Sequence, residues 1–207
     1  MAINHNTIIK VCGMKDGENI RQVEQLKPTM MGFIFYPPSP RYCGIKPDYL
    51  PQNTQRVGVF VDAELALIKE KIFDFQLDYI QLHGHETPAF CQELKAINIG
   101  VIKAIAVSCE ADLWVAEAYQ DVCDYLLFDT KTPQQGGSGK QFNWNLLSAY
   151  TGHTPFLLSG GIGIDDVEKL KKFHHPMLAG YDLNSRFELQ PGIKDNRLLQ
   201  TFKEQLS

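Results

Sequence analysis

The chain has little that would bind nucleic acid or cross a membrane. Its 207 residues carry 20 Lys and Arg against 24 Asp and Glu, a formal net charge of -4. No basic run is long enough to follow a phosphate backbone, and no apolar run approaches the roughly 20 residues that span a bilayer. The first residues lack the basic start and apolar core of a signal peptide. We therefore expect a cytoplasmic protein without nucleic-acid or membrane partners.

Paired cysteines and a dinucleotide fingerprint are also missing. No Cys-x-x-Cys occurs, and an odd count of five cysteines cannot pair completely within one chain, which favours reduced thiols. The cysteines are Cys12, Cys43, Cys91, Cys109 and Cys123. No Gly-x-Gly-x-x-Gly follows the first expected strand, which argues against an open, doubly wound, dinucleotide-binding sheet.

What the chain does contain is a repeated alternation of strand and helix patterns. At 44% hydrophobic and 21% charged residues, it can build one sizeable core, so we expect a single domain over 1–207. Strands are predicted at 7–12, 30–35, 56–61, 79–82, 100–105, 125–128, 156–158 and 177–179. Helices are predicted at 15–26, 46–50, 64–75, 88–97, 111–119, 144–150, 165–173 and 194–205. Eight such units predict the α/β class and a compact (β/α)8 TIM barrel.

Polar side chains stand on strands that a barrel would bury. If the chosen strand faces point inward, six of them converge near the carboxyl ends of the strands, where such barrels keep their chemistry. They are Lys10, Cys12, His83, Lys103, Asp129 and Asp182. The alternative is structural, with the two lysines neutralising the two aspartates inside the barrel, because an unpaired internal charge is costly.

Two turns are suited to bind an anion. The segments 159–162 and 182–185 leave the seventh and eighth strands, and backbone N–H groups at such places bind phosphate. Arg41 lies in a proline-rich loop, where its guanidinium could grip a planar carboxylate through two parallel hydrogen bonds. Asp129 ends an apolar strand and precedes a glycine-rich loop, and we interpret 136–140 as a lid that excludes water.

Taken together, these motifs resemble the phosphoribosylanthranilate isomerases, tryptophan-pathway enzymes with a (β/α)8 barrel. The resemblance covers essentially the whole chain and keeps its order. It rests on Ile-Ile-Lys-Val-Cys-Gly-Met, Gly-Phe-Ile-Phe-Tyr-Pro-Pro-Ser-Pro-Arg-Tyr, Val-Gly-Val-Phe-Val, Gln-Leu-His-Gly, Ile-Lys-Ala, Leu-Phe-Asp-Thr-Lys-Thr-Pro, Gly-Gly-Ser-Gly-Lys-Gln-Phe-Asn-Trp, Leu-Ser-Gly-Gly-Ile and Pro-Gly-Ile-Lys-Asp.

The resemblance implies an Amadori rearrangement of N-(5-phosphoribosyl)anthranilate to 1-(2-carboxyphenylamino)-1-deoxyribulose 5-phosphate, with no metal or organic cofactor. It implies that Cys12 is the general base, that Asp129 is the general acid and that Arg41 holds the anthranilate carboxylate. Further residues assigned to the substrate are His83, Gly160, Gly161, Asp182, Asn184 and Ser185, with Lys10 and Arg186 as additional candidates.

The proposed chemistry makes opposite demands on the two catalytic groups. Asp129 must be protonated to open the ribose ring, and burial could raise its pKa as required. Cys12 must act as a base, so a neighbouring cation such as Lys10 should favour the thiolate. One departure concerns the last phosphate loop, where Arg186 replaces a glycine common in the family; we hypothesise that its side chain contacts phosphate instead.

Two other functions remain open. A histidine-pathway sugar isomerase performs the same rearrangement with an aspartate where this chain has Cys12, and its two half-barrels resemble each other, which the halves of this chain do not. A non-catalytic phosphate-binding barrel would share the fold, since fold alone does not determine activity. We expect a small-molecule substrate and a monomer or homodimer.

Overall fold

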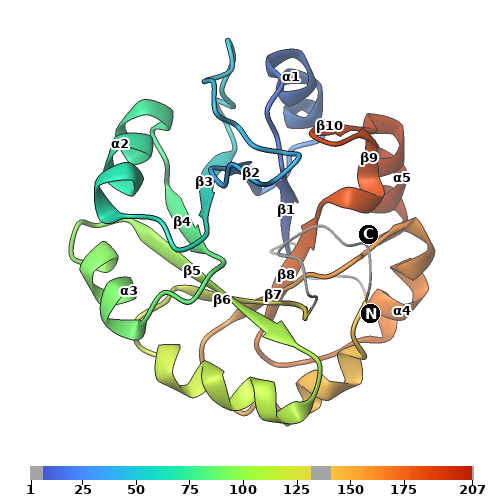
Figure 1. Cartoon of the computed structure of the whole chain (residues 1–207). Coiled ribbons are helices and arrows are strands. Elements are labelled where there is room, and N and C mark those ends of the chain that lie inside the picture. The colour runs from blue at the N-terminus through green and yellow to red at the C-terminus, as the bar shows by residue number, and fades with distance from the viewer. Residues whose placement is uncertain (1–6, 132–140, 207) are drawn as a thin grey trace.

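Eight parallel strands close into a barrel in the computed structural model, which describes residues 7–131 and 141–206. The strands are hydrogen-bonded in sequence order and β1 pairs with β8, so the sheet has no free edge (Figure 1). They are β1 (Ile8–Cys12), β2 (Met30–Ile34), β3 (Gln55–Phe60), β4 (Tyr79–Leu82), β5 (Gly100–Val107), β6 (Tyr125–Thr130), β7 (Phe156–Leu158) and β8 (Leu178–Leu183). The predicted (β/α)8 barrel is confirmed.

Helices surround the barrel on its outside (Figure 1). The α-helices are α1 (Gly17–Gln25), α2 (Leu65–Phe75), α3 (Pro88–Lys95), α4 (Val167–Lys172) and α5 (Asn196–Leu206). The 3₁₀ helices are η1 (Glu110–Tyr119), η2 (Trp144–Ala149), η3 (Ile164–Asp166) and η4 (Ser185–Phe187). A small antiparallel ribbon of β9 (Glu188–Gln190) and β10 (Ile193–Lys194) follows β8. Among the described residues, no helix is long and apolar enough to cross a membrane.

Two predicted helices adopt the tighter 3₁₀ form. In η1 the buried residues Leu113, Ala116 and Tyr119 recur every third position, and in η2 the buried pair is Trp144 and Leu147. A spacing of three matches the three residues per turn of a 3₁₀ helix, so this form keeps the apolar side chains on one face.

The second predicted helix, at 46–50, does not form. The chain between β2 and β3 is irregular there, with a single bridge between Ile34 and Tyr42. Pro47 and Pro51 explain this, because proline lacks the backbone N–H and disfavours helical geometry in the residue before it. A long loop carrying Arg41 therefore takes the place of a helix.

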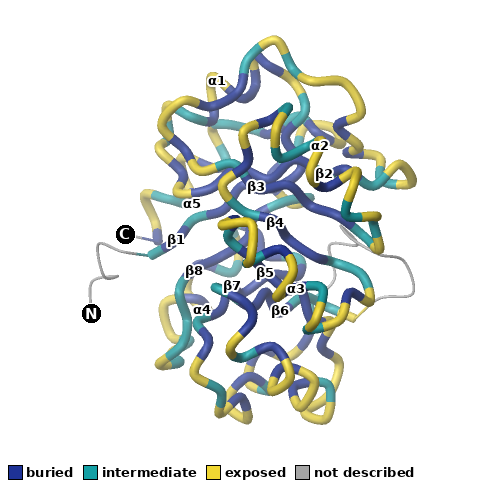
Figure 2. The backbone as a smooth tube through the Cα atoms, turned by 90° about the vertical axis from the view of Figure 1, so that its left-hand side faces the viewer, coloured by how far each residue is buried: buried dark blue, intermediate teal, exposed yellow. Residues whose placement is uncertain are grey.

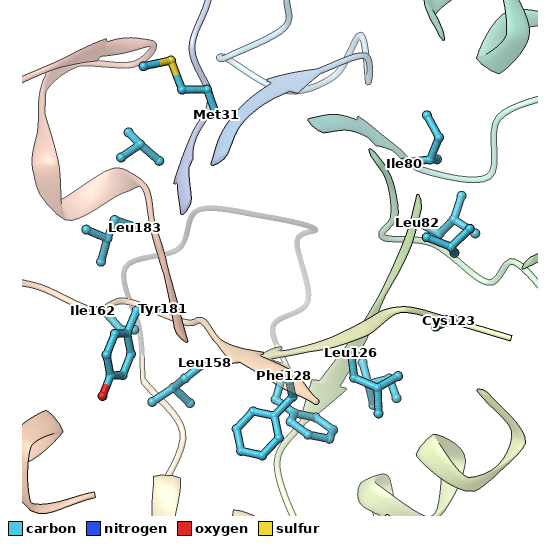
Figure 3. Close-up of a cluster of buried hydrophobic side chains, with 14 of the residues drawn as sticks. Met31, Ile80, Leu82, Cys123, Leu126, Phe128, Leu158, Ile162, Tyr181 and Leu183 are labelled. Carbon is cyan, nitrogen blue, oxygen red and sulfur yellow. The ribbon is translucent and has the colours of Figure 1, made fainter. Parts of the chain in front are cut away.

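The core has two layers separated by the strands. An outer cluster lies between strands and helices, and Figure 3 shows its side chains, among them Leu82, Leu126 and Phe128, pointing away from the barrel axis. An inner cluster fills the barrel and comprises Ile8, Met30, Val57, Ile102, Ala104, Leu127 and Leu157. In Figure 2 the strands are mostly buried, and exposed residues lie on the outside of the surrounding helices and loops.

One predicted strand face is wrong. Lys103 pairs in register with Leu82 and Leu126, which belong to the outer cluster, whereas its neighbours Ile102 and Ala104 point into the barrel. Lys103 therefore lies under the helices. Alternating side chains point to opposite faces of a strand, but the alternation does not say which face lies inside the barrel. An assignment that is wrong by one residue therefore puts every side chain of the strand on the wrong face.

Candidate active site

Cys12 is the last residue of β1 and lies at the carboxyl-terminal mouth of the barrel. Its side chain is buried, with 3% of the residue exposed. Gly32 on β2 pairs with Cys12 in register, and a Cβ atom at Gly32 would come within 2.7 Å of the Cys12 Sγ. The thiol therefore occupies the space that a side chain at 32 would fill.

Beside the thiol, Lys10 and Asp182 form an ion pair inside the barrel. The Lys10 Nζ donates to Asp182 Oδ1 at 2.7 Å, and Lys10 has no exposed surface. The hydroxyl of Ser159, the first residue after β7, donates to Asp182 Oδ2 at 3.2 Å. This confirms the Lys10–Asp182 half of the ion-pair alternative, and the pair lies directly beneath Cys12.

Burial dominates the electrostatics of Cys12. It raises the pKa of the Cys12 thiol above its ordinary value, although Lys10 and Lys194 oppose the effect. Burial also lowers the pKa of the Lys10 amine, but Asp182 and Cys12 outweigh it and the pKa is raised overall. The expectation that Lys10 would favour the thiolate is correct in sign, yet its effect is smaller than that of burial.

Asp129 lies near the end of β6 and faces His83, which follows β4. The His83 Nε2 is 3.3 Å from Asp129 Oδ2, and the backbone N–H of Thr130 donates to Asp129 Oδ1 at 2.8 Å. Asp129 and His83 are both partly exposed and line a cavity of about 470 Å³. The alternative in which Lys103 neutralises Asp129 is wrong, because the Lys103 amine donates to Glu86 Oε2 at 3.0 Å.

The loop after β7 connects the two catalytic candidates. Gly160 has φ +90°, and a Cβ atom there would lie 2.3 Å from the Thr130 Oγ1 and 3.2 Å from Asp129 Oδ1. Only glycine fits this backbone without a clash. Ser159, one residue earlier, contacts the Lys10–Asp182 pair, so a continuous set of contacts runs from Cys12 to Asp129.

Arg41 is held by a carboxylate of the protein itself. Its Nε donates to Glu188 Oε1 at 2.9 Å, and its Nη2 donates to Glu188 Oε2 at 2.6 Å. The paired geometry predicted for a substrate carboxylate is thus formed with Glu188. Within the described part of the chain, Nη1 of Arg41 makes no hydrogen bond and stays available as a donor.

Sequence reasoning gave no role to Lys194 or Glu188. Lys194 is buried, with 1% of the residue exposed. Its amine donates to Glu188 Oε1 and to Asn184 Oδ1, both at 2.8 Å. Burial lowers the pKa of Lys194 below its ordinary value, although Glu188 and Cys12 oppose this. The motif Pro-Gly-Ile-Lys-Asp contains Lys194 and could have pointed to it. The strand β10 is too short, however, for an alternation of apolar and polar residues to show which way Lys194 faces.

The two predicted phosphate loops lie side by side. Arg186, in η4 after β8, packs against Gly163 in the loop after β7, and its Nη2 donates to Asp165 Oδ2 at 3.3 Å. Gly160 and Gly161 both have positive φ, at +90° and +66°. Asn184 and Ser185 begin the facing loop. Arg186 therefore spans the gap between the loops, with part of its side chain exposed.

The structure brings most of the predicted site residues to one end of the barrel. Lys103 also lines the cavity of Asp129 and His83, but its amine binds Glu86. Cys12, Asp129 and Asp182 come from three strands, His83 directly follows β4, and Arg41 joins them from the loop after β2. The lid predicted at 136–140 lies outside the described residues. The structure adds Lys194 to the residues predicted for the site.

Comparison with known proteins identifies the family. The model of the N-(5'-phosphoribosyl)anthranilate (PRA) isomerase family matches residues 9–205. An N-(5'-phosphoribosyl)anthranilate isomerase from Phocaeicola vulgatus is 52% identical over 199 residues, covering 96% of this chain and 97% of the relative.

Solved structures agree. A phosphoribosyl anthranilate isomerase from Thermotoga maritima superimposes with a TM-score of 0.81 at 33% identity, covering 97% of this chain and 98% of the other. Another, in complex with reduced 1-(o-carboxyphenylamino)-1-deoxyribulose 5-phosphate, gives a TM-score of 0.80 at 30% identity with the same coverage. The chain therefore belongs to the N-(5'-phosphoribosyl)anthranilate isomerase family.

Proposed function

We propose that this chain converts N-(5-phosphoribosyl)anthranilate to 1-(2-carboxyphenylamino)-1-deoxyribulose 5-phosphate, with Asp129 as general acid and Cys12 as general base. The observation that carries the proposal is the placement of one thiol and one carboxyl at the same barrel mouth, in a chain of this family. Lys10, Asp182 and the loop after β7 join the two groups.

Ring opening is the step assigned to Asp129. Its protonated carboxyl gives a proton to the ribose ring oxygen as the bond from that oxygen to C1 breaks, and the nitrogen lone pair forms the C1=N bond of a protonated Schiff base. Thr130 N–H and His83 Nε2 lie within reach of the two carboxylate oxygens and stabilise the negative charge that develops on Asp129.

Proton abstraction is the step assigned to Cys12. Its thiolate takes the proton from C2 of the sugar, and the electron pair moves through C1 to the nitrogen, giving the enolamine. Proton transfer to C1 and loss of the C2 hydroxyl proton then yield the ketone. Because burial raises the pKa of the Cys12 thiol, the thiolate is a minor but strongly basic species, and the Lys10 and Lys194 amines stabilise it.

In this proposal different groups of the barrel mouth hold the phosphate and the anthranilate carboxylate, and Lys194 and Glu188 link Asn184 to Arg41. Backbone N–H groups of Gly160, Gly161 and Ser185, the Asn184 side chain and the Arg186 guanidinium hold the phosphate. Nη1 of Arg41 donates to the anthranilate carboxylate, while Glu188 keeps the guanidinium plane fixed. We further infer a cytoplasmic enzyme that acts as a monomer or homodimer.

A fluorescence assay with freshly prepared phosphoribosylanthranilate tests the proposal on wild type, Cys12→Ser and Asp129→Asn. We expect each substitution to lower kcat by about 10²–10⁴-fold, the usual contribution of general acid–base catalysis. Asp121→Asn is the control, because this exposed carboxyl precedes β6 at the opposite end of the barrel and its loss leaves turnover unchanged. Activity that survives both active-site substitutions contradicts the mechanism, and a wild type without turnover favours a non-catalytic phosphate-binding barrel.

A further inference from the structure

A buried glutamine stands behind the His83–Asp129 pair. Gln81 points into the barrel from β4 and is 1% exposed. Its amide Nε2 lies 3.0 Å from the His83 Nδ1, and the other imidazole nitrogen faces Asp129. The three side chains therefore form a line from the barrel interior to the proposed catalytic acid.

The arrangement determines where the imidazole carries its proton. The Gln81 amide nitrogen faces Nδ1 and can only donate, so in this orientation Nδ1 accepts from Gln81 and the hydrogen of the neutral ring lies on Nε2. That hydrogen then points at Asp129 Oδ2. His83 thus meets the carboxyl as a donor and stabilises the charge that Asp129 acquires when it gives up its proton.

The opposite tautomer would interfere with the proposed reaction. With its hydrogen on Nδ1, His83 would present the Nε2 lone pair to Asp129 and would accept the proton meant for the ribose oxygen. The Gln81 amide hydrogens oppose a hydrogen on Nδ1 and so disfavour this state.

Gln81 has no other evident task. Within the described residues His83 is its only side-chain hydrogen-bond partner, and its Oε1 is buried without one. A buried amide oxygen without a donor destabilises the fold. Packing alone would be served better by an apolar side chain of the same length, so the contact with His83 is the feature that needs an amide at this position.

We propose that Gln81 is a positioning residue that holds His83 in the Nε2-protonated tautomer, so that His83 serves Asp129 as a hydrogen-bond donor. This rests on the proposed role of Asp129 as general acid. The proposal adds a residue that touches neither substrate nor reacting atoms and acts through the imidazole.

Steady-state kinetics of Gln81→Met, which keeps the side-chain length and removes the amide, provide the first test. We expect kcat to fall at least tenfold with KM changed less than twofold, and thermal stability to be retained because the buried unpaired oxygen is gone. Gln92→Met, on the exposed face of α3, is the matched control and should behave as wild type. A kcat within twofold of wild type for Gln81→Met would overturn the proposal.

The imidazole ¹⁵N signals of His83 provide the second test, because they distinguish the two tautomers directly. Asp129→Leu removes the partner of Nε2 and leaves Gln81 alone to select the tautomer. We expect the Nε2-protonated form in wild type and in Asp129→Leu, and a mixture of tautomers when Gln81→Met is added. A predominantly Nδ1-protonated ring in either of the first two proteins overturns the proposal.

The two tests separate this inference from the function on which it rests. If Asp129 is not the general acid, Asp129→Asn stays active while the NMR tautomer still follows Gln81. If Gln81 has only a packing role, Asp129→Asn is still inactive, but Gln81→Met changes neither the His83 tautomer nor kcat.

Discussion

At the scale of single residues, Lys10 contacts both a structural ion-pair partner and the proposed general base. Its amine has no exposed surface, binds Asp182 at 2.7 Å and stabilises the Cys12 thiolate. A buried ion pair is weak evidence for stability by itself, but removing one partner leaves the other charge uncompensated. Replacing the lysine should therefore affect both folding and catalysis, through different partners.

We predict that Lys10→Met lowers the free energy of unfolding by about 3–5 kcal/mol, the cost of leaving a buried charge such as Asp182 unpaired. Urea unfolding measures this. The double variant Lys10→Met with Asp182→Leu removes both charges and should regain much of the stability, while kcat stays low because the thiolate has lost its cation. Recovery of wild-type kcat by the double variant would show that Lys10 serves the fold alone.

Arg186 is the second residue-scale test. We predict that Arg186→Ala raises KM by less than about tenfold, because this side chain is partly exposed and an exposed ion pair contributes about 0–1 kcal/mol. The dependence of KM on salt should weaken as well. Arg197→Ala, an exposed arginine on α5, is the control. An unchanged KM and salt dependence in Arg186→Ala would exclude a contact with phosphate.

At the scale of elements, the loop after β7 is the most constrained part of the site. Gly160 has a left-handed backbone, and any Cβ there would collide with Thr130 beside Asp129. The sequence predicted this loop correctly as a glycine turn after the seventh strand. It did not indicate that the same turn touches the proposed general acid, because Asp129 and Gly160 become neighbours only when β6 pairs with β7.

We predict that Gly160→Ala raises KM and lowers kcat together and destabilises the protein by about 1–3 kcal/mol, the usual cost of backbone strain. Asn98→Ala is the control, since Asn98 also has positive φ (+59°) but lies in the turn before β5, at the opposite end of the barrel. It should lose stability with little change in KM. If both variants keep wild-type kinetics, the loop does not contribute to binding as proposed.

Helical elements illustrate where local patterns mislead. The periodicities at 111–119 and 144–150 correctly predicted helices, and their spacing of three favours the 3₁₀ form that the structure has. The expected helix at 46–50 fails because Pro47 and Pro51 outweigh the short apolar pattern. That failure matters for function, since the loop in its place presents Arg41 to the barrel mouth.

At the scale of the whole molecule, Glu188 links the carboxyl-terminal ribbon to the loop after β2. It accepts hydrogen bonds from Arg41 and Lys194, which are 147 and 6 residues away in the sequence. Burial raises the pKa of the Glu188 carboxyl, but Arg41 and Lys194 outweigh it, so that the pKa lies below its usual value of 4.5. The ionised carboxylate therefore contributes to global stability.

Because this pKa is lowered in the folded state, the contribution is fully present above pH 4.5 and is lost as the pH falls through the folded value below it. We predict that the unfolding free energy of wild type decreases more steeply below pH 4.5 than that of Glu188→Gln, measured by chemical denaturation. Glu188→Gln should be less stable at neutral pH, since it leaves two cations without a counter-charge. Parallel pH dependences for the two proteins would contradict the assigned role.

The sequence by itself predicted the barrel and the family, and it located the candidate catalytic residues at the ends of strands. Eight strand–helix alternations favour a closed barrel, and residues such as Cys12 and Asp129 at strand ends then reach the same rim because parallel strands share a direction. Tertiary structure alone decided which partners those residues have: Lys103 turned outward to Glu86, while Arg41 and Lys194 met on Glu188. The physical reason is twofold. The alternation of side chains along a strand does not say which of them face the barrel interior. Contacts across a closed barrel also join residues far apart in the sequence, and no local sequence pattern predicts such pairs.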